Sequence, residues 1–365
     1  MAVPEVNAHL HTPYSFSAFR DIPQALDLAV RDGVKVVGIN DFYSLDGYRE
    51  WSEECGRRRL FPLFNIEFIS LNAEDQAAGL RANDPNNPGR TYLSGKGLAY
   101  PVILSGEQAR QLEAVKAESN AQVAAMCGKL NAHLEAVGAG FSIDFAKVER
   151  ELTRGSIRER HLAKALRLTV DERCASDSEK AALYGRIFGG KALASDPCDV
   201  AKVENEIRGK LLKAGGAAFV PEDPKAFLPM TTVQTIIECA GGIPTYPFLA
   251  DDAKGNFTDF EADLQKCADT LRRRAIRSVE FITTRNTTAV LESYAGYLQD
   301  EGFIVTFGSE HNTPAMEPVK LRTRDASELS EKLRAINWRG ACAVAAHQAG
   351  LDSIAAGEDI IMKSI

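Results

Sequence analysis

The sequence lacks three features that would place the protein in a narrow class: paired cysteines, a long apolar run and an excess of basic charge. None of its seven cysteines forms a C-x-x-C pair, and their odd number and scattered positions argue against a zinc ribbon or a disulfide framework. We therefore expect reduced thiols and a cytoplasmic protein. No stretch approaches about 18 uninterrupted apolar residues, so no membrane span is expected.

The charge balance is mildly acidic, with 43 basic residues against 50 acidic residues and a net charge of −7. Such a chain has no general attraction for nucleic acid or for an anionic membrane. The expected partner is a small molecule, and an anionic substrate must be bound by a local site. No pattern indicates the oligomeric state.

The 365 residues, 45% of them hydrophobic, are enough for a barrel of roughly 200–250 residues and an additional module. Residues 1–104 and 231–365 alternate between strand and helix patterns, whereas residues 105–230 are mostly helical. Alternating strands and helices favour parallel βαβ units. We therefore predict one α/β barrel, built from residues 1–104 and 231–365, with residues 105–230 as a helical insertion.

The pattern predicts the positions of individual strands and helices. Strands are expected at residues 6–12, 34–39, 60–71, 243–249, 276–282 and 303–307, and residues 98–104 are considered as one more strand. Residues 72–97 interrupt the pattern because they contain a loop rich in Asn, Asp and Pro. The chain is expected to end in two helices, at residues 326–336 and 341–349.

Polar residues that suit a metal stand at the ends of the expected strands. His9 and His11 end the first strand, and residues two apart in a strand point to the same side. Glu67 lies late in the third strand region, and Glu310-His311 follows the last strand. The carboxyl ends of the strands form the active-site face of an α/β barrel. Two imidazoles and two carboxylates suit Zn²⁺, Mn²⁺ or Fe²⁺ better than Ca²⁺.

Five short motifs resemble those of the polymerase and histidinol phosphatase (PHP) family. These are His9-Leu10-His11-Thr12 with Ser15 or Ser17, residues 38–42 (Gly-Ile-Asn-Asp-Phe), Asn65-Ile66-Glu67, residues 242–247 (Gly-Ile-Pro-Thr-Tyr-Pro) and residues 308–311 (Gly-Ser-Glu-His). The resemblance implies a distorted (β/α)7-type barrel and a metal-dependent phosphoesterase. The insertion also resembles that of members that cleave phosphate from nucleotides, in which an Arg-Pro-His segment opens a helix like Arg158-Glu159-Arg160-His161.

The chain departs from the family pattern at positions where that pattern places metal ligands. Phe42 and Tyr246 replace two ligand histidines, and neither side chain is a good ligand. The resemblance implies that the retained ligands, His9, His11, Glu67 and Glu310, hold one ion rather than three. Asp41 and His311 are predicted to handle the proton. Alternatively, Asp41 acts behind a ligand, forms part of a second ligand set with His311, or caps the turn after its strand.

Basic residues are candidates for binding a phosphorylated substrate. Arg158, Arg160 and His161 open a helix of the insertion, and guanidinium groups match phosphate oxygens, although a basic helix start is also a common solvated surface. Arg285 either orients the substrate or helps to cap the following helix. Arg20, in the first strand-to-helix loop, either meets an anion or only confers solubility.

Three functions remain open at this point. The first is a metal-dependent phosphoesterase that hydrolyses a small phosphorylated metabolite or nucleotide. The second is a single-metal hydrolase or lyase for a sugar or carboxylate, because one metal polarises a carbonyl as well as a phosphoryl group. The third is a degenerate member that binds a ligand without catalysis. A complete four-residue site argues against the third, since buried unpaired carboxylates are costly without an ion.

Overall fold

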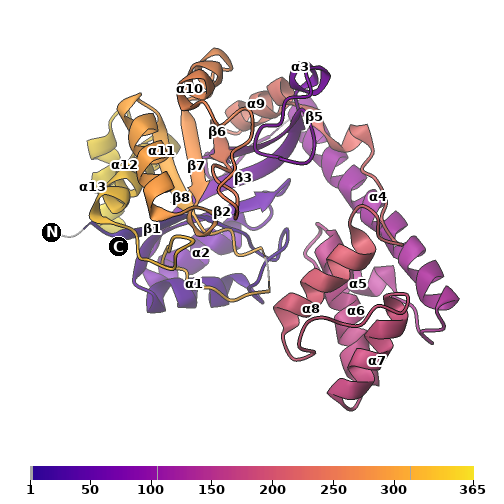
Figure 1. Cartoon of the computed structure of the whole chain (residues 1–365). Helices are drawn as coiled ribbons and strands as arrows, with labels where there is room; N and C mark the ends of the chain where they lie inside the picture. Colours follow the sequence, from indigo (N-terminus) through magenta and orange to yellow (C-terminus); the bar gives the residue numbers. More distant parts are fainter. Residues whose placement is uncertain (1–2, 105, 313) are drawn as a thin grey trace.

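The structure, a computed structural model, describes residues 3–104, 106–312 and 314–365. Within these residues one sheet contains eight strands (Figure 1). They are β1 (Glu5–Leu10), β2 (Val34–Phe42), β3 (Phe61–Leu71), β4 (Arg90–Lys96), the two-residue β5 (Leu228–Pro229), β6 (Ile243–Phe248), β7 (Ser278–Ile282) and β8 (Ile304–Gly308).

The sheet curls into a nearly closed barrel in the order β1-β2-β3-β4-β6-β7-β8, with β5 beside β3. The strands are parallel except for β4, which runs antiparallel to both β3 and β6. Backbone hydrogen bonds close the barrel beyond the ends of β1 and β8, where His11 N donates to Glu310 O over 2.8 Å. The expected α/β barrel is confirmed.

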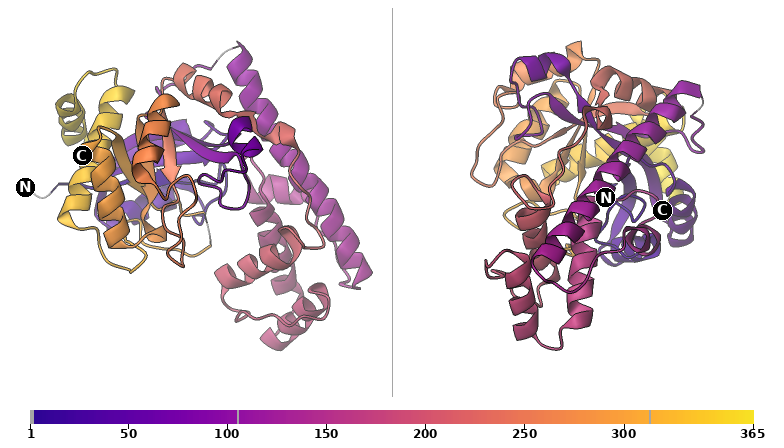
Figure 2. Two further views of the ribbon diagram at one scale, coloured as in Figure 1. Left: turned by 45° about the horizontal axis from the view of Figure 1, so that its top comes forward. Right: turned by 90° about the vertical axis from the view of Figure 1, so that its right-hand side faces the viewer.

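Helices cover the outside of the barrel (Figures 1 and 2). They are α1 (Ile22–Arg31), α2 (Tyr48–Arg58), the short α3 (Ala73–Ala77), α9 (Met230–Cys239), α10 (Leu264–Arg273), α11 (Thr288–Asp300), α12 (Glu331–Gln348) and α13 (Ile354–Ser364). In α1 the apolar residues Ile22, Leu26 and Ala29 recur at helical spacing and are buried. Its N-cap Asp21 accepts a hydrogen bond from Gln24 N, which orients the helix start.

The helices of the middle segment have a hydrophobic core separate from that of the barrel. The long α4 (Gly106–Ala136) leads away from the barrel to α5 (Phe145–Leu152), α6 (Glu159–Arg173), α7 (Asp177–Ile187) and α8 (Val200–Ile207), and a π-helical turn follows at Arg208–Leu212 (Figure 1). Leu130, Leu162 and Val203 come from three of these helices and are fully buried in that core. The boundaries at 104/105 and 230/231 stay a prediction, and Ser105 lies outside the described residues.

Some expected elements are wrong. No strand occupies residues 98–104; the strand of this region is β4, inside the segment that looked irregular. Thr91, Ser94 and Lys96 of β4 are polar yet buried, so hydrophobic patterning does not reveal the strand.

The end of the chain also differs from the expectation. The helices expected at residues 326–336 and 341–349 are replaced by one helix, α12, which runs through Gly340, and by α13, which was not expected. A Cβ at Gly340 would lie 1.9 Å from Val305 O, so this glycine permits close packing of α12 on β8 and does not end the helix. Among the described residues, no helix is long and apolar enough to cross a membrane.

Candidate metal centre

His9, His11 and Glu67 meet at one end of the barrel. His9 belongs to β1, His11 follows it, and Glu67 lies in β3; all three are almost fully buried. The Nε2 atoms of the two imidazoles are 3.3 Å apart. Glu67 Oε2 lies 3.4 Å from His11 Nε2 and 3.6 Å from His9 Nε2. Three potential ligand atoms therefore surround one point, as the sequence predicted for these residues.

The spacing of these atoms matches the requirements of a metal ion. Nitrogen and oxygen ligands at about 2.0–2.2 Å from a tetrahedral zinc ion are separated by about 3.3–3.6 Å. Glu67 Oε2 is buried and has no hydrogen-bond partner among the described residues. Burial raises the pKa of Glu67, and the negative charges of Glu310 and Glu280 raise it further. The hydrogen bond and charge of His9 oppose this rise. A cation between the three side chains would relieve this unpaired carboxylate, so the residues fit a divalent metal.

His9 is held from behind by an acidic side chain. Its Nδ1 lies 2.8 Å from Glu280 Oε2, in β7. The other oxygen of Glu280 is paired with the ammonium group of Lys96, in β4. Burial opposes charge on His9, but the negative charge and hydrogen bond of Glu280 outweigh it and raise the pKa of His9 to about 9. Glu280 thus orients the imidazole through Nδ1, so that Nε2 faces His11 and Glu67, with Asn40 Nδ2 3.0 Å away. A metal bound at Nε2 would replace the proton there, and a carboxylate behind the ring is common for metal-binding histidines.

His11 is held in a similar way through a serine. Its Nδ1 lies 3.3 Å from Ser15 Oγ, and Ser15 donates to Asp41 Oδ1 over 2.5 Å. Asp41 also accepts from the backbone and side chain of Thr12. Burial raises the pKa of Asp41 to about 6, although these donors oppose the rise. Asp41 therefore lies behind His11 and does not line the cavity; its predicted role with the proton stays a prediction.

Glu310 lies beside the three-residue cluster but is paired with other groups. Its carboxylate accepts from Arg285 Nη2 over 2.8 and 2.7 Å and from Asn312 Nδ2 over 2.8 Å. The group of potential ligands within 4.8 Å of one another contains His9, His11 and Glu67. Ligation by Glu310 stays a prediction. It would require the carboxylate to turn from Arg285 toward the imidazoles.

The backbone at Glu310 and His311 is strained, because both residues have left-handed φ angles of 62° and 55°. Just before them, a Cβ at Gly308 would lie 2.1 Å from His9 Cβ, so only glycine allows β8 to approach His9 this closely.

The imidazole of His311 is held by two hydrogen bonds: its Nδ1 lies 2.8 Å from Ser309 Oγ, and its Nε2 lies 2.9 Å from Glu317 O. Both ring nitrogens of His311 are engaged outside the main cavity, and its role with the proton stays a prediction.

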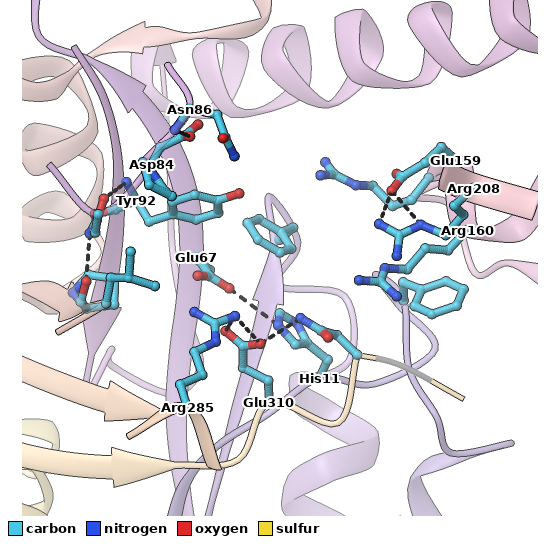
Figure 3. Close-up of a pocket in the computed structure, with 18 of the residues that line it drawn as sticks. His11, Glu67, Asp84, Asn86, Tyr92, Glu159, Arg160, Arg208, Arg285 and Glu310 are labelled. Atoms are coloured by element: carbon cyan, nitrogen blue, oxygen red, sulfur yellow. Dashed lines mark hydrogen bonds and ion pairs between the residues drawn. The ribbon is translucent and has the colours of Figure 1, made fainter. Parts of the chain in front are cut away.

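A cavity of about 360 Å³ opens above the cluster, between the barrel and the helical segment. In the close-up of Figure 3, Glu67, His11 and Glu310 lie together, while Arg160 and Arg208 lie across the cavity. The wall from the helical segment carries the basic residues Arg158, Arg160, Arg208 and Lys213. Asp84, Asn86 and Tyr92, from β4 and the loop before it, line another side.

Three of these basic residues have no carboxylate partner at ion-pair distance among the described residues: Arg158, Arg160 and Lys213. By contrast, Arg208 Nη2 is paired with Glu159 Oε1 over 2.7 Å. Arg158 contacts the ring of Phe42, with its guanidinium carbon 4.9 Å from the ring centre. Arg160 Nη1 is buried without a hydrogen-bond partner in the described part of the chain. Burial, together with the charge of Arg208, lowers the pKa of Arg160 to about 10.

Two other predicted substrate-binding residues do not line this cavity. His161 accepts a hydrogen bond from Arg158 N at its Nδ1 over 2.9 Å, which fixes the start of α6. Burial lowers the pKa of His161 to about 3. Arg20 is 77% exposed and paired with Asp21. Arg285 does line the cavity.

Phe42 and Tyr246, which stand where the resemblance implied ligand histidines, contact other side chains. The ring of Phe42 stacks on His11 with their centres 5.2 Å apart. Tyr246 is buried and donates a hydrogen bond to Glu261 Oε1 over 2.8 Å. Neither side chain adds a metal ligand to the cluster.

Sequence reasoning missed Lys96, Glu280, Arg208 and Lys213. Glu280 is an isolated charge inside an apolar strand, Ser-Val-Glu-Phe-Ile. A charge in such a strand indicates a buried, paired group, and the sequence alone contains this pattern. Lys96 had no comparable signal because its strand was not recognised. Arg208 and Lys213 follow a helix in a region with many other charges, and only the fold brings them to Arg160.

Searches against protein-family models and against curated protein sequences gave no match. Solved structures do share the fold. An amidohydrolase from Chromobacterium violaceum, solved with bound sulfate and without metal, is 15% identical with a TM-score of 0.58, over 91% of this chain and 96% of the other. A protein from Bifidobacterium adolescentis, provisionally assigned as a metal-dependent phosphoesterase, is 15% identical with a TM-score of 0.59, over 91% of this chain and 95% of the other. At this identity the likeness establishes the barrel with its helical segment and no activity.

Proposed function

We propose that this protein is a metal-dependent phosphoesterase that hydrolyses a small phosphorylated metabolite or nucleotide. One observation carries the proposal. A cluster of two histidines and a carboxylate with metal-ligand spacing faces three basic side chains that lack carboxylate partners among the described residues, Arg158, Arg160 and Lys213. A phosphate group requires both a cation at the reacting phosphorus and donors for its remaining oxygens.

The metal and the basic wall would have different roles. A divalent metal held by His9, His11 and Glu67 would polarise a phosphoryl oxygen and lower the pKa of water. Arg158 and Arg160 present guanidinium forks, which bind phosphate oxygens by two parallel hydrogen bonds. Together with Lys213 they neutralise the charge of the bound ester and orient it toward the cluster.

Glu310 and Arg285 supply a second polar group beside the reacting position. Their ion pair lines the same cavity as His11 and Glu67. We infer that Arg285 donates to the substrate or to the leaving oxygen once its carboxylate partner turns toward the metal. Glu310 is then available as the fourth ligand that the sequence predicts.

We infer one bound ion, which would be Zn²⁺, Mn²⁺ or Fe²⁺. Two imidazoles and one or two carboxylates suit these metals. Phe42 and Tyr246 offer no ligand, and Glu280 is already paired with Lys96. These pairings leave a single group of ligands in the described part of the barrel.

The neighbouring structures are compatible with this proposal. The amidohydrolase was solved with bound sulfate, which has the tetrahedral shape of phosphate, and the other neighbour is provisionally assigned to phosphoester chemistry. An uncharged carbonyl substrate would not need the basic side chains Arg158, Arg160 and Lys213 that line this cavity. Non-catalytic ligand binding without a metal would leave the buried Glu67 Oε2 unpaired.

The test is a substrate screen on protein with a measured metal content. p-Nitrophenyl phosphate, sugar phosphates and nucleoside monophosphates are compared with carboxylic esters and amides after loading with Zn²⁺, Mn²⁺ or Fe²⁺. We expect release of inorganic phosphate that a chelator abolishes and the metal restores. Hydrolysis of the esters or amides alone, or no metal binding under any condition, would refute the proposal.

A further inference from the structure

The interior of the barrel contains a fully buried chain of charged groups that reaches the candidate metal centre. It starts at Lys96, passes through Glu280 and ends at His9, and the side chains of Lys96 and Glu280 are 1% and 0% exposed. These residues are far apart in sequence, because Glu280 is 184 positions after Lys96 and 271 positions after His9. Their meeting is therefore a property of the closed barrel.

The antiparallel direction of β4 explains how a lysine reaches this position. Lys96 is the last residue of β4, and it pairs with Ile243 at the start of β6. Its side chain therefore enters from the end of the barrel opposite to the metal cluster. Its ammonium group contacts the carboxylate of Glu280, Ala8 O at 3.2 Å and Asn40 Oδ1 at 3.3 Å. All its partners are protein groups that accept hydrogen bonds.

Glu280 divides its two oxygens between two partners. Oε1 is paired with Lys96, and Oε2 lies 2.8 Å from His9 Nδ1. Both oxygens are thus occupied, so Glu280 has no free oxygen to offer an ion at the cluster. A buried carboxylate facing a metal would otherwise become a ligand, because it lacks solvent to stabilise its charge.

We propose that Lys96 and Glu280 are a positioning pair for metal binding, in which the lysine holds Glu280 on His9 Nδ1 so that His9 Nε2 is presented to the ion. The ammonium group of Lys96 pairs with one oxygen of Glu280, and the other oxygen of Glu280 is the acceptor that orients the imidazole. The inference rests on the metal-binding part of the proposed function and is independent of the substrate.

The experiment measures Co²⁺ binding to the full chain by competition with a chromophoric chelator and by the visible absorption of the bound ion. We expect Glu280→Gln and Lys96→Met each to weaken Co²⁺ binding about 10- to 100-fold, the usual effect of losing a group that orients a metal ligand. We also expect the visible absorption bands of Co²⁺ to change, because the imidazole is free to rotate. A purely structural ion pair would alter stability and leave both readouts as in the wild type.

Two further variants keep the test decisive. The double variant Lys96→Met/Glu280→Gln leaves no unpaired buried charge, so it provides folded protein even where a single variant does not. Glu261→Gln is the matched control, because Glu261 is an equally buried carboxylate of the barrel that bonds Tyr246 instead of a ligand histidine. It should retain wild-type affinity.

The outcomes separate this inference from the proposed function. Wild-type affinity and an unchanged Co²⁺ spectrum in the double variant would overturn the positioning role and leave the proposed function intact. Absence of Co²⁺ binding by the wild-type protein would overturn both.

Discussion

Replacing Arg160 by methionine should stabilise the free protein and weaken its binding of phosphate. The guanidinium group is largely buried without an ion-pair partner among the described residues, and burial with the charge of Arg208 lowers its pKa to about 10. Each pKa unit corresponds to about 1.4 kcal/mol, so the unfavourable charge corresponds to about 3 kcal/mol. Since relaxation reduces such penalties, we expect the free energy of unfolding to rise by about 1–3 kcal/mol in Arg160→Met.

The same substitution removes a charged hydrogen-bond donor from the cavity. A charge-assisted hydrogen bond contributes about 1.5–3 kcal/mol, so kcat/KM for a phosphate ester should fall about 10- to 150-fold. Inorganic phosphate should raise the Tm of the wild-type protein, because it binds the native state only, and should do so less in the variant. Denaturant unfolding, thermal unfolding with phosphate, and initial rates measure these three effects.

Two variants are controls for this prediction. Arg20→Met removes an exposed arginine that is paired with Asp21 outside the cavity, so it should alter neither stability nor kcat/KM appreciably. Arg160→Lys keeps the positive charge, so inorganic phosphate should still raise the Tm of this variant, although less than that of the wild type. A less stable Arg160→Met protein with normal kcat/KM would show that Arg160 is a structural residue and would refute the reasoning.

Three other predictions concern the centre and its surroundings. Glu67→Gln should abolish tight metal binding while the protein remains folded, because it removes the charge of the unpaired buried oxygen; equal metal content in variant and wild type would contradict the ligand assignment. Gly308→Ala places a methyl group 2.1 Å from His9 Cβ, so unfolding and metal titrations should show a loss of about 1–3 kcal/mol and weaker metal binding; an unperturbed variant would show that β1 and β8 lie farther apart. The pKa of His161 is lowered from 6.5 to about 3, so the native state favours the neutral ring; this contribution to stability is present above pH 6.5 and is lost as the pH falls toward 3. His161→Gln keeps an acceptor for Arg158 N without titrating, so between pH 6.5 and 4 denaturant unfolding should show the wild type losing up to about 1.4 kcal/mol per pH unit relative to the variant; parallel stability curves would rule out the buried neutral ring.

Local patterns in the sequence, with the resemblance of short motifs, were sufficient to predict the barrel and the proximity of His9, His11 and Glu67. The alternation of apolar strands and amphipathic helices depends on side-chain periodicity, which is a property of neighbouring residues. For the same reason His9 and His11 were correctly expected to face one point, since residues two apart share one side of a strand. Glu67 was identified because it stands late in the strand beside them, where parallel strands bring their ends together.

The sequence alone did not determine the groups that control the charges of the site. Lys96 is buried on a polar antiparallel strand that patterning did not recognise, and its partner Glu280 lies 184 residues away. The ion pair between Arg285 and Glu310, and the meeting of Arg160 with Arg208, also arise only when distant segments pack together. Burial and pairing of charges depend on every segment that surrounds them, and the tertiary structure alone decides these neighbours.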